Sequence, residues 1–151
     1  MTALASISNL PALQPYVASA IVLTLNAIGL ANATALTRAK ADEVINPEDA
    51  PRTKKANVVY EGGNDMTARY RRAHRNALEN TPFFMITALL LTMMGTSATV
   101  GGIVFGGYAV ARVLHSVCYV KGVQPFRTIF FVLGSLLQLA VLGLIGYGSL
   151  A

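Results

Sequence analysis

The sequence predicts an all-α integral membrane protein, a single domain over residues 1–151 in which four transmembrane helices form a bundle. Hydrophobic residues make up 54% of the 151 residues and the mean hydropathy is +0.52, which is too apolar for a soluble domain of this size. Nine of the twelve Lys and Arg residues lie between Arg38 and Arg75. Long runs without basic residues flank that region, and they indicate membrane spans.

The first span is predicted over about residues 15–37, an apolar stretch that is as long as a bilayer requires. Arg38 and Lys40 close it, and residues 39–63 then form a polar loop. Within that loop, the run Asn-Pro-Glu-Asp at 46–49 predicts a short helix. Asn can cap such a helix, Pro suits its first position and acids suit its first turn.

The second helix is predicted over about residues 64–95. Asn64 or Asp65 is suited to cap its N-terminus, and Gly95 is suited to end it. The first half of this helix is basic and the second half is apolar, so that one helix carries both the charge and a membrane-spanning stretch. Pro82 is expected to kink it, which a helix bundle tolerates inside a membrane.

The third and fourth helices are predicted over about residues 99–120 and 125–150. Gly102 and Gly106 make a GxxxG pattern in the third helix, which allows another helix to approach closely. Pro125 is suited to the start of the fourth helix, because a proline there removes an amide hydrogen that would have no partner.

Four spans place both termini on one side of the membrane and the loops 39–63 and 121–125 on the other. These loops and the adjoining helix ends carry nearly all of the charge, so the positive-inside rule makes them cytoplasmic. The rule applies equally to a bacterial inner membrane and to the endoplasmic reticulum. A net charge of +5 on a soluble surface would suit nucleic acid, but its position here indicates membrane lipid and no nucleic-acid partner.

The basic half of the second helix places several polar side chains on one helical face. They are Arg72, Arg75, Asn76 and Glu79. One interpretation is a basic cluster that anchors the helix to anionic headgroups. Glu79 favours the other interpretation, a buried polar site, because an acid further into the membrane is unfavourable unless it pairs inside a bundle.

Arg112, His115 and Tyr119 share one face of the third helix. Arg112 precedes Lys121 by nine residues, which places it about 13 to 14 Å along the helix from the loop. A cation at that depth requires a partner. Glu79 is the only acid at a comparable depth in a predicted span that could supply one, so an ion pair between Glu79 and Arg112 is one interpretation of both residues.

The other interpretation is a binding site for an anionic ligand, since arginine binds carboxylates through two parallel hydrogen bonds. The arginines that would surround the pocket are Arg38, Arg72, Arg75 and Arg127. No metal is expected, because neither His74 nor His115 has an acid or a cysteine at ligand spacing. The sequence contains no P-loop, Rossmann glycine motif or nucleophile elbow.

Four motifs carry a resemblance to a known family. They are Asn46-Pro47-Glu48-Asp49-Ala50, Arg72-Ala73-His74-Arg75-Asn76 with Glu79 and Pro82-Phe83, Arg112-x-x-His115-x-x-x-Tyr119, and Pro125-x-Arg127. In this order and spacing, over about residues 16–150, the chain resembles the membrane-associated proteins in eicosanoid and glutathione metabolism, the MAPEG family. It is most similar to the branch that holds microsomal glutathione transferase and microsomal prostaglandin E synthase.

The resemblance implies a homotrimer of four-helix subunits, with glutathione bound between subunits at the cytoplasmic end and a lipophilic second substrate arriving from the bilayer. The glutathione contacts implied by the motifs are Arg38, Arg72, Arg75, Asn76, Glu79, His115, Tyr119 and Arg127. The implied catalytic candidates are Arg127, which would stabilise the thiolate, the adjacent Thr128, and Asp49 for proton transfer. As a first-turn acid, Asp49 also has a purely structural interpretation.

The implied activity is conjugation of the glutathione thiolate to lipophilic electrophiles, with peroxide reduction as a second reaction of the same thiolate. The alternative is a prostaglandin E synthase-like isomerase. The chain departs from that enzyme by having Thr128 in place of a serine and Phe131 in place of a tyrosine, which disfavours isomerisation. A small transporter or channel that uses the buried ionisable residues is an interpretation from a different class, and a purely structural bundle is a third.

Overall fold

The computed structural model describes residues 7–52 and 57–150, most of which are helical. This part of the chain contains four long helical segments. They are α2 (Leu13–Lys40), α3 (Asp65–Met93), a composite third segment made of α4 (Ala98–Gly101), η2 (Gly102–Gly106) and α5 (Gly107–Lys121), and α6 (Phe126–Leu150). The predicted all-α class is confirmed.

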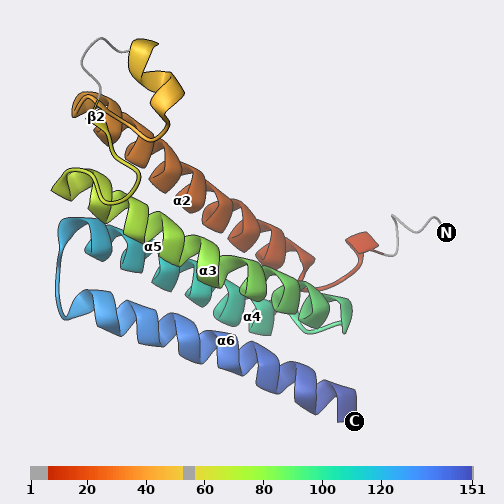
Figure 1. Ribbon diagram of the computed structural model, residues 1–151. Helices are drawn as coiled ribbons and strands as arrows, with labels where there is room; N and C mark the ends of the chain where they lie inside the picture. The colour runs from red at the N-terminus through yellow and green to blue at the C-terminus, as the bar shows by residue number, and fades with distance from the viewer. Residues whose placement is uncertain (1–6, 53–56, 151) are drawn as a thin grey trace.

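The four segments lie side by side, and α3 contacts α2, α5 and α6 (Figure 1). The loop after α2 and the turn between α5 and α6 lie at one end of the bundle, whereas the α3–α4 connection and the end of α6 lie at the other (Figure 1). The last turns of α2 and α5 therefore meet the first turns of α3 and α6. We call this end, which carries most of the charged residues, the charged end.

The start of α3 is fixed by the cap that the sequence predicts. Asn64 Oδ1 accepts hydrogen bonds from the backbone amides of Met66 and Thr67, each at 3.1 Å. The backbone amide of Asn64 in turn donates to Glu43 Oε1 at 2.8 Å, so the loop is tied to the helix start. The helix is continuous through Pro82.

The loop between α2 and α3 contains structure that the sequence did not predict. β1 (Glu43–Val44) and β2 (Asn57–Val58) form a parallel ladder of two residues each. The helix expected in this loop is present as the 3₁₀ helix η1 (Pro47–Arg52). A strand of two residues is too short for an alternating hydrophobic pattern, so the ladder was not predictable from residue periodicity.

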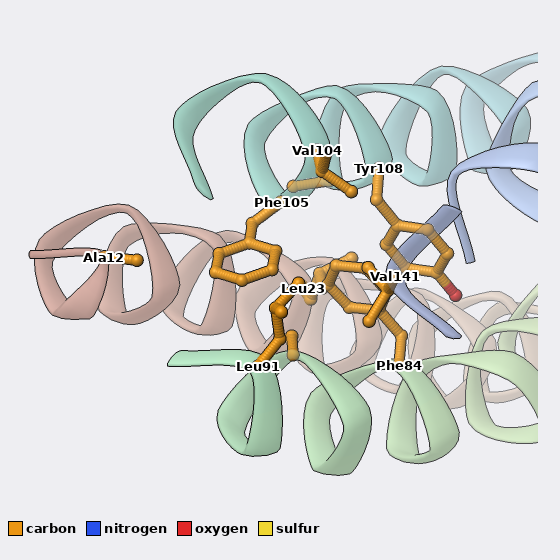
Figure 2. Packing of buried hydrophobic residues seen from close by; sticks show 10 residues of the cluster. Ala12, Leu23, Phe84, Leu91, Val104, Phe105, Tyr108 and Val141 are labelled. Atoms are coloured by element: carbon orange, nitrogen blue, oxygen red, sulfur yellow. The ribbon is translucent and has the colours of Figure 1, made fainter. Parts of the chain in front are cut away.

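The core centres on aromatic rings from α3 and the third segment (Figure 2). The rings of Phe84 and Tyr108 stack with centroids 3.6 Å apart, and Phe84 meets Phe105 edge to face at 6.1 Å. Leu23 of α2 and Val141 of α6 complete the cluster and are fully buried. All four segments thus pack on one apolar centre, which fixes the helices relative to one another.

The glycines of the third segment show where close helix contact is needed. The sequence pattern pointed to Gly102 and Gly106, but no other side chain lies within 4 Å of where a Cβ would stand on either, so within the described chain this expectation is wrong. At Gly101 an added Cβ would lie 2.8 Å from the Cβ of Ala12. The buried face runs through Gly101 and Phe105, one position away from the expected pair.

Three helices of the described chain are long and apolar enough to cross a membrane. They are Leu13–Lys40, Ala98–Lys121 and Phe126–Leu150, with mean hydropathies of 1.6, 1.5 and 2.3 over their most apolar stretches. Most of the large apolar side chains on these helices are exposed in the isolated chain, as contact with lipid or another subunit requires. The segment expected as a span over residues 64–95 is helical, but its charged first half keeps it less apolar than the other three.

Replacing Gly101 with Ala is expected to destabilise the bundle, because the new methyl group would overlap the Ala12 side chain. Overpacking of this kind costs about 1 to 3 kcal/mol. Gly102→Ala is the matched control, since open space surrounds that position and alanine favours a helix by about 1 kcal/mol. Thermal unfolding in detergent should give a lower Tm for Gly101→Ala and an unchanged or higher Tm for Gly102→Ala. Equal Tm values would contradict the packing described here.

Candidate functional site

Three of the predicted residues cluster where α5 meets α6 at the charged end. Arg127 lies in the first turn of α6, and its guanidinium carbon is 4.9 Å from the centroid of the Tyr119 ring. The His115 ring stands edge-on to the Tyr119 ring at 5.7 Å. We call these three residues the α5/α6 corner. It combines a cation, an imidazole and a phenol in one small volume.

The hydrogen bonding of His115 leaves one ring nitrogen available. Its Nδ1 lies 2.9 Å from the backbone carbonyl oxygen of Arg127. Because a carbonyl only accepts, Nδ1 carries the proton, and a neutral ring then presents Nε2 as an acceptor. Nε2 is buried and has no hydrogen-bond partner among the described residues, so a ligand N–H or O–H could satisfy it. No group of three or more metal-ligating side chains is found in the described ranges.

The first backbone amides of α6 are already bonded to the preceding turn. The amide of Arg127 donates to the carbonyl of Val123 at 3.2 Å. Those of Thr128 and Ile129 both donate to the carbonyl of Pro125, at 2.9 and 3.1 Å. The helix terminus therefore has little free N–H capacity for an anion. Strong stabilisation of an anion at this corner has to come from the Arg127 guanidinium.

Thr128 and Phe131 flank the corner. The Thr128 side chain is exposed, and its hydroxyl accepts from the Gln124 side-chain amide nitrogen at 3.1 Å, within the turn, while the Gln124 amide oxygen accepts from Arg127 Nε at 3.1 Å. The Phe131 ring lies 5.7 Å from the His115 ring, and its centroid is 5.8 Å from the guanidinium carbon of Arg112. Phe131 thus stands between the corner and the deeper Arg112.

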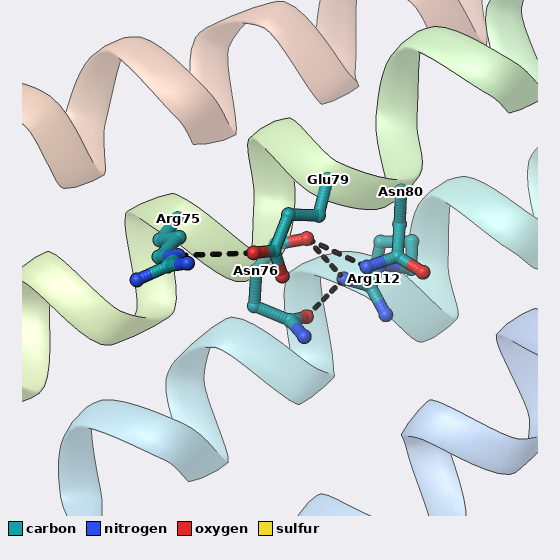
Figure 3. A network of polar contacts seen from close by, with 5 residues as sticks. All are labelled: Arg75, Asn76, Glu79, Asn80 and Arg112. Atoms are coloured by element: carbon teal, nitrogen blue, oxygen red, sulfur yellow. Dashed lines mark hydrogen bonds and ion pairs between the residues drawn. The ribbon is translucent and has the colours of Figure 1, made fainter.

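The polar residues of α3 make two separate sets of contacts (Figure 3). Arg75 Nε donates to Glu79 Oε1 at 3.0 Å, an ion pair whose side chains are 81% and 55% exposed. Asn76 instead faces α5, where its side-chain and backbone oxygens both accept from Arg112 Nη2. The pairing of Glu79 with Arg112, one of the two interpretations of the sequence, is therefore wrong for the described chain.

The orientation of α3 explains this outcome. Arg75 and Glu79 are one turn apart and largely exposed, so their ion pair contributes little to stability. Asn76 is on the side of the helix that packs against α5. Arg112 is only 3% exposed and obtains its hydrogen bonds from neutral amide and carbonyl oxygens. Sequence spacing placed Glu79 at the right depth but did not determine which side of α3 faces Arg112.

The remaining candidate residues line two other cavities. Arg38 and Asp49 line one of about 280 Å³ at the C-terminal end of α2. Asn46 Nδ2 also donates to Asp49 Oδ2 at 3.4 Å, at the start of η1. Arg72 and Arg75 line another of about 410 Å³, between α3 and the loop. A single chain thus holds the candidate residues in several places rather than around one pocket.

Sequence reasoning missed a further polar cavity beside Arg112. Its volume is about 310 Å³, and it is lined by Asn80, Phe83, Tyr108, Arg112, Gly134, Ser135, Gln138 and Leu139. A signal was present in the sequence, because Ser135 and Gln138 are polar residues three positions apart in a highly apolar helix. Polar residues inside a membrane span usually serve a function.

Comparison with known proteins identifies the family of this chain. The MAPEG family model matches residues 12–147, which includes most of all four helical segments. Microsomal glutathione S-transferase 1 of Bos taurus and that of Homo sapiens are each 32% identical over 108 residues, covering 70% of this chain and 70% of their own. Prostaglandin E synthase of Homo sapiens is 27% identical over 137 residues, 90% of this chain and 89% of its own. With its apolar helices, this chain is an integral membrane protein that belongs to the MAPEG family.

Proposed function

We propose that the protein is a membrane-bound glutathione transferase that conjugates the glutathione thiolate to lipophilic electrophiles dissolved in the bilayer. The observation that carries the proposal is the α5/α6 corner, where Arg127 is held beside His115 and Tyr119. The family membership and the names of the relatives, glutathione transferase and prostaglandin E synthase, support it. The same thiolate would also reduce lipophilic peroxides.

The chemistry requires a stabilised thiolate. A free thiol has a pKa near 8.5, and lowering it by about two units takes roughly 2.7 kcal/mol of preferential interaction with the thiolate. A guanidinium in a partly dry site can supply that. The thiolate then attacks the electrophilic carbon, the leaving group departs with its electron pair, and proximity supplies most of the remaining rate enhancement. In this proposal Arg127 stabilises the thiolate and Thr128 stands beside it.

The tripeptide would be held through its charged ends. Arginine suits the two carboxylates of glutathione, and a carboxylate suits its ammonium group. The residues to which we assign this binding are Arg38, Arg72, Arg75, Asn76, Glu79, His115 and Tyr119, with Arg127. The exposed Arg75–Glu79 ion pair can exchange partners with a zwitterionic ligand, because both side chains are accessible. His115 Nε2 would accept from an amide N–H of the peptide.

We further propose that the complete site forms between subunits of a homotrimer. In one chain, Arg38 and Asp49 line a cavity of their own, separate from the α5/α6 corner. A neighbouring subunit could bring its Arg38 and Asp49 to this corner, where Asp49 would take part in proton transfer. Subunit contact would also cover part of the exposed apolar surface of the helices.

A glutathione-dependent prostaglandin E synthase-like isomerase is the second candidate, favoured by the 27% identity to prostaglandin E synthase over 90% of this chain. Phe131 counts against it. Phe131 packs between His115 and Arg112 and has no hydroxyl to donate to a bound peroxide. Conjugation requires only the thiolate and an accessible electrophile, so the transferase is the better-supported function.

The proposal includes four membrane spans, with the charged end in the cytoplasm of a bacterial cell or on the cytoplasmic face of the endoplasmic reticulum. Single cysteines at Asn57 and Ser97, in a Cys118→Ser background, should react with a membrane-impermeant maleimide from opposite sides. Both positions are exposed. Asn57 lies in the chain before α3 begins, and Ser97 lies in the chain after α3 ends. Labelling of both from the same side would show that α3 does not cross the membrane.

The assembly is tested by native mass spectrometry in mild detergent, where the trimer should be the dominant species. A heterotrimer gives a sharper test of the shared site. Arg38→Leu and Arg127→Leu subunits are each expected to have little activity alone, and mixing them should restore part of the transferase activity. Restoration requires that one site combine residues of two subunits. No gain on mixing, with trimers present, would place each site within one chain.

Replacing Arg127 with Leu should raise the pKa of bound glutathione toward that of the free thiol. The stabilised thiolate is present above its lowered pKa and is lost as the pH falls through it, so the ultraviolet thiolate signal at pH 7 should largely disappear in the variant. Turnover at pH 7 should fall by roughly 25-fold, because a pKa near 6.5 leaves about 76% of the bound thiol ionised and a pKa near 8.5 only about 3%. Arg127→Lys should retain part of the signal, because a point charge remains but the planar fork is lost.

Arg72→Leu is the comparison variant for this measurement. It should weaken glutathione binding, measured by calorimetry, more than Arg127→Leu does, while the thiolate signal at saturating glutathione is kept. If Arg127→Leu left both the thiolate signal and turnover unchanged, the role assigned to Arg127 would be wrong. Arg38 would then become the leading candidate for stabilising the glutathione thiolate.

A further inference from the structure

The side chain of Gln124 connects Arg127 and Thr128, the adjacent candidate catalytic residues in the first turn of α6. Its amide oxygen accepts from Arg127 Nε at 3.1 Å and from Arg127 Nη2 at 2.5 Å, and its amide nitrogen donates to Thr128 Oγ1 at 3.1 Å. The partners determine which way the amide points, because a guanidinium can only donate hydrogen bonds. Gln124 therefore binds both side chains at once.

Capping of α6 does not account for the Gln124 side chain. A polar residue just before a helix can bind the free backbone amides of its first turn. The amides of residues 127–129 already donate to backbone carbonyls of the preceding turn, so they have no need of a side-chain cap. The Gln124 side chain is also exposed, which means that it does not fill the core. Its contacts are with the candidate site.

The Arg127 guanidinium is held on one face and along one edge. The Tyr119 ring lies against the face, with its centroid 4.9 Å from the guanidinium carbon. The Gln124 oxygen takes the edge formed by Nε and Nη2. Within the described ranges, this oxygen is the only hydrogen-bond acceptor of the guanidinium. Nη1 and the second hydrogen of Nη2 are thus left to donate to a ligand.

An amide oxygen orients the guanidinium and leaves its charge intact. A carboxylate in the same place would form a bidentate ion pair with the Nε–Nη2 edge and neutralise the arginine. The chain contains an arginine of that other kind, because Arg75 Nε is bound by the Glu79 carboxylate at 3.0 Å. Stabilisation of an anionic sulfur requires the uncompensated charge, so a neutral holder suits Arg127.

We propose that Gln124 is a positioning residue that aims the free edge of the Arg127 guanidinium at the glutathione sulfur while preserving the positive charge. This role rests on the proposed function, because it concerns the thiolate that Arg127 is proposed to stabilise. Gln124 acts through Arg127 and does not touch the substrate. Because the Thr128 hydroxyl accepts from Gln124, its own hydrogen also stays available as a donor.

Two variants separate the charge from the hydrogen bond. The readout is the pH midpoint of the ultraviolet thiolate signal, measured on the full-length protein in detergent with saturating glutathione. Gln124→Glu places a carboxylate on the guanidinium edge and should raise the midpoint by roughly 1 to 3 units, as a nearby like charge does for an acid. The thiolate exists above its pKa, so the signal at pH 7 should fall. Gln124→Met has neither acceptor nor charge and should raise the midpoint less than half as far.

Gln14→Glu is the matched control for the added charge. It makes the same substitution at an exposed glutamine in the first turn of α2, at the opposite end of the bundle from Arg127. The thiolate midpoint should be the same in this variant as in the wild type.

A double-mutant cycle distinguishes positioning from a structural role. With Arg127 present, Gln124→Met should lower turnover at saturating glutathione by roughly two- to tenfold, the value of a hydrogen bond of this kind, with little change in KM. In an Arg127→Lys background the same substitution should have almost no effect, because an ammonium group has no planar fork to orient. A structural contribution would be lost equally in both backgrounds.

The outcomes separate this role from the proposed function. A wild-type midpoint near that of free glutathione would overturn the proposed function, and the role of Gln124 would fall with it. A lowered wild-type midpoint that Gln124→Glu leaves in place would overturn the role of Gln124 alone, as would equal turnover losses in the two backgrounds. Thermal unfolding should give unchanged Tm values, since Gln124 is exposed. A lowered Tm in both Gln124 variants would assign the side chain to the fold and overturn the proposal.

Discussion

A buried arginine in a membrane-spanning helix must find hydrogen-bond acceptors within the protein, and the packing of three helices depends on how Arg112 does so. Its acceptors are the two oxygens of Asn76, which dock α5 on α3. Gly134 leaves room for the arginine side chain on α6, and Phe131 packs over its guanidinium. Because charged groups are so unfavourable in hydrocarbon, these contacts restrict the rotation of each helix about its own axis.

The same face of α5 connects the apolar core with the α5/α6 corner. Tyr108 stacks on Phe84 in the core, Arg112 binds α3 one turn later, and His115 and Tyr119 follow toward the charged end. Residues at these spacings lie along one stripe of a helix. The geometry of the corner is therefore set by apolar packing two to three turns away, where apolar side chains from all four segments meet.

Local rules made much of this structure predictable. The Asn64 cap follows from residue type, and the helices follow from long apolar runs between turn residues. The meeting of His115 with Arg127 was predictable as well, because a short turn joins their helices. The ion-pair partner of Glu79 was not predictable, because spacing gives the depth of a residue along its helix but not which neighbouring helix its side chain faces. The GxxxG pattern failed for a similar reason, because the buried face runs through Gly101, one residue from Gly102.

Asn76 serves two purposes at once, and this affects how variants at that position can be understood. It supplies both acceptors of Arg112, and it also belongs to the proposed glutathione site. A substitution there would alter the fold and the ligand site together, so a loss of affinity would not measure a ligand contact alone. Over evolution, a residue under two independent constraints accepts fewer replacements than one with a single role. Asn76 should accordingly vary less among relatives of this chain than the exposed Arg75 beside it.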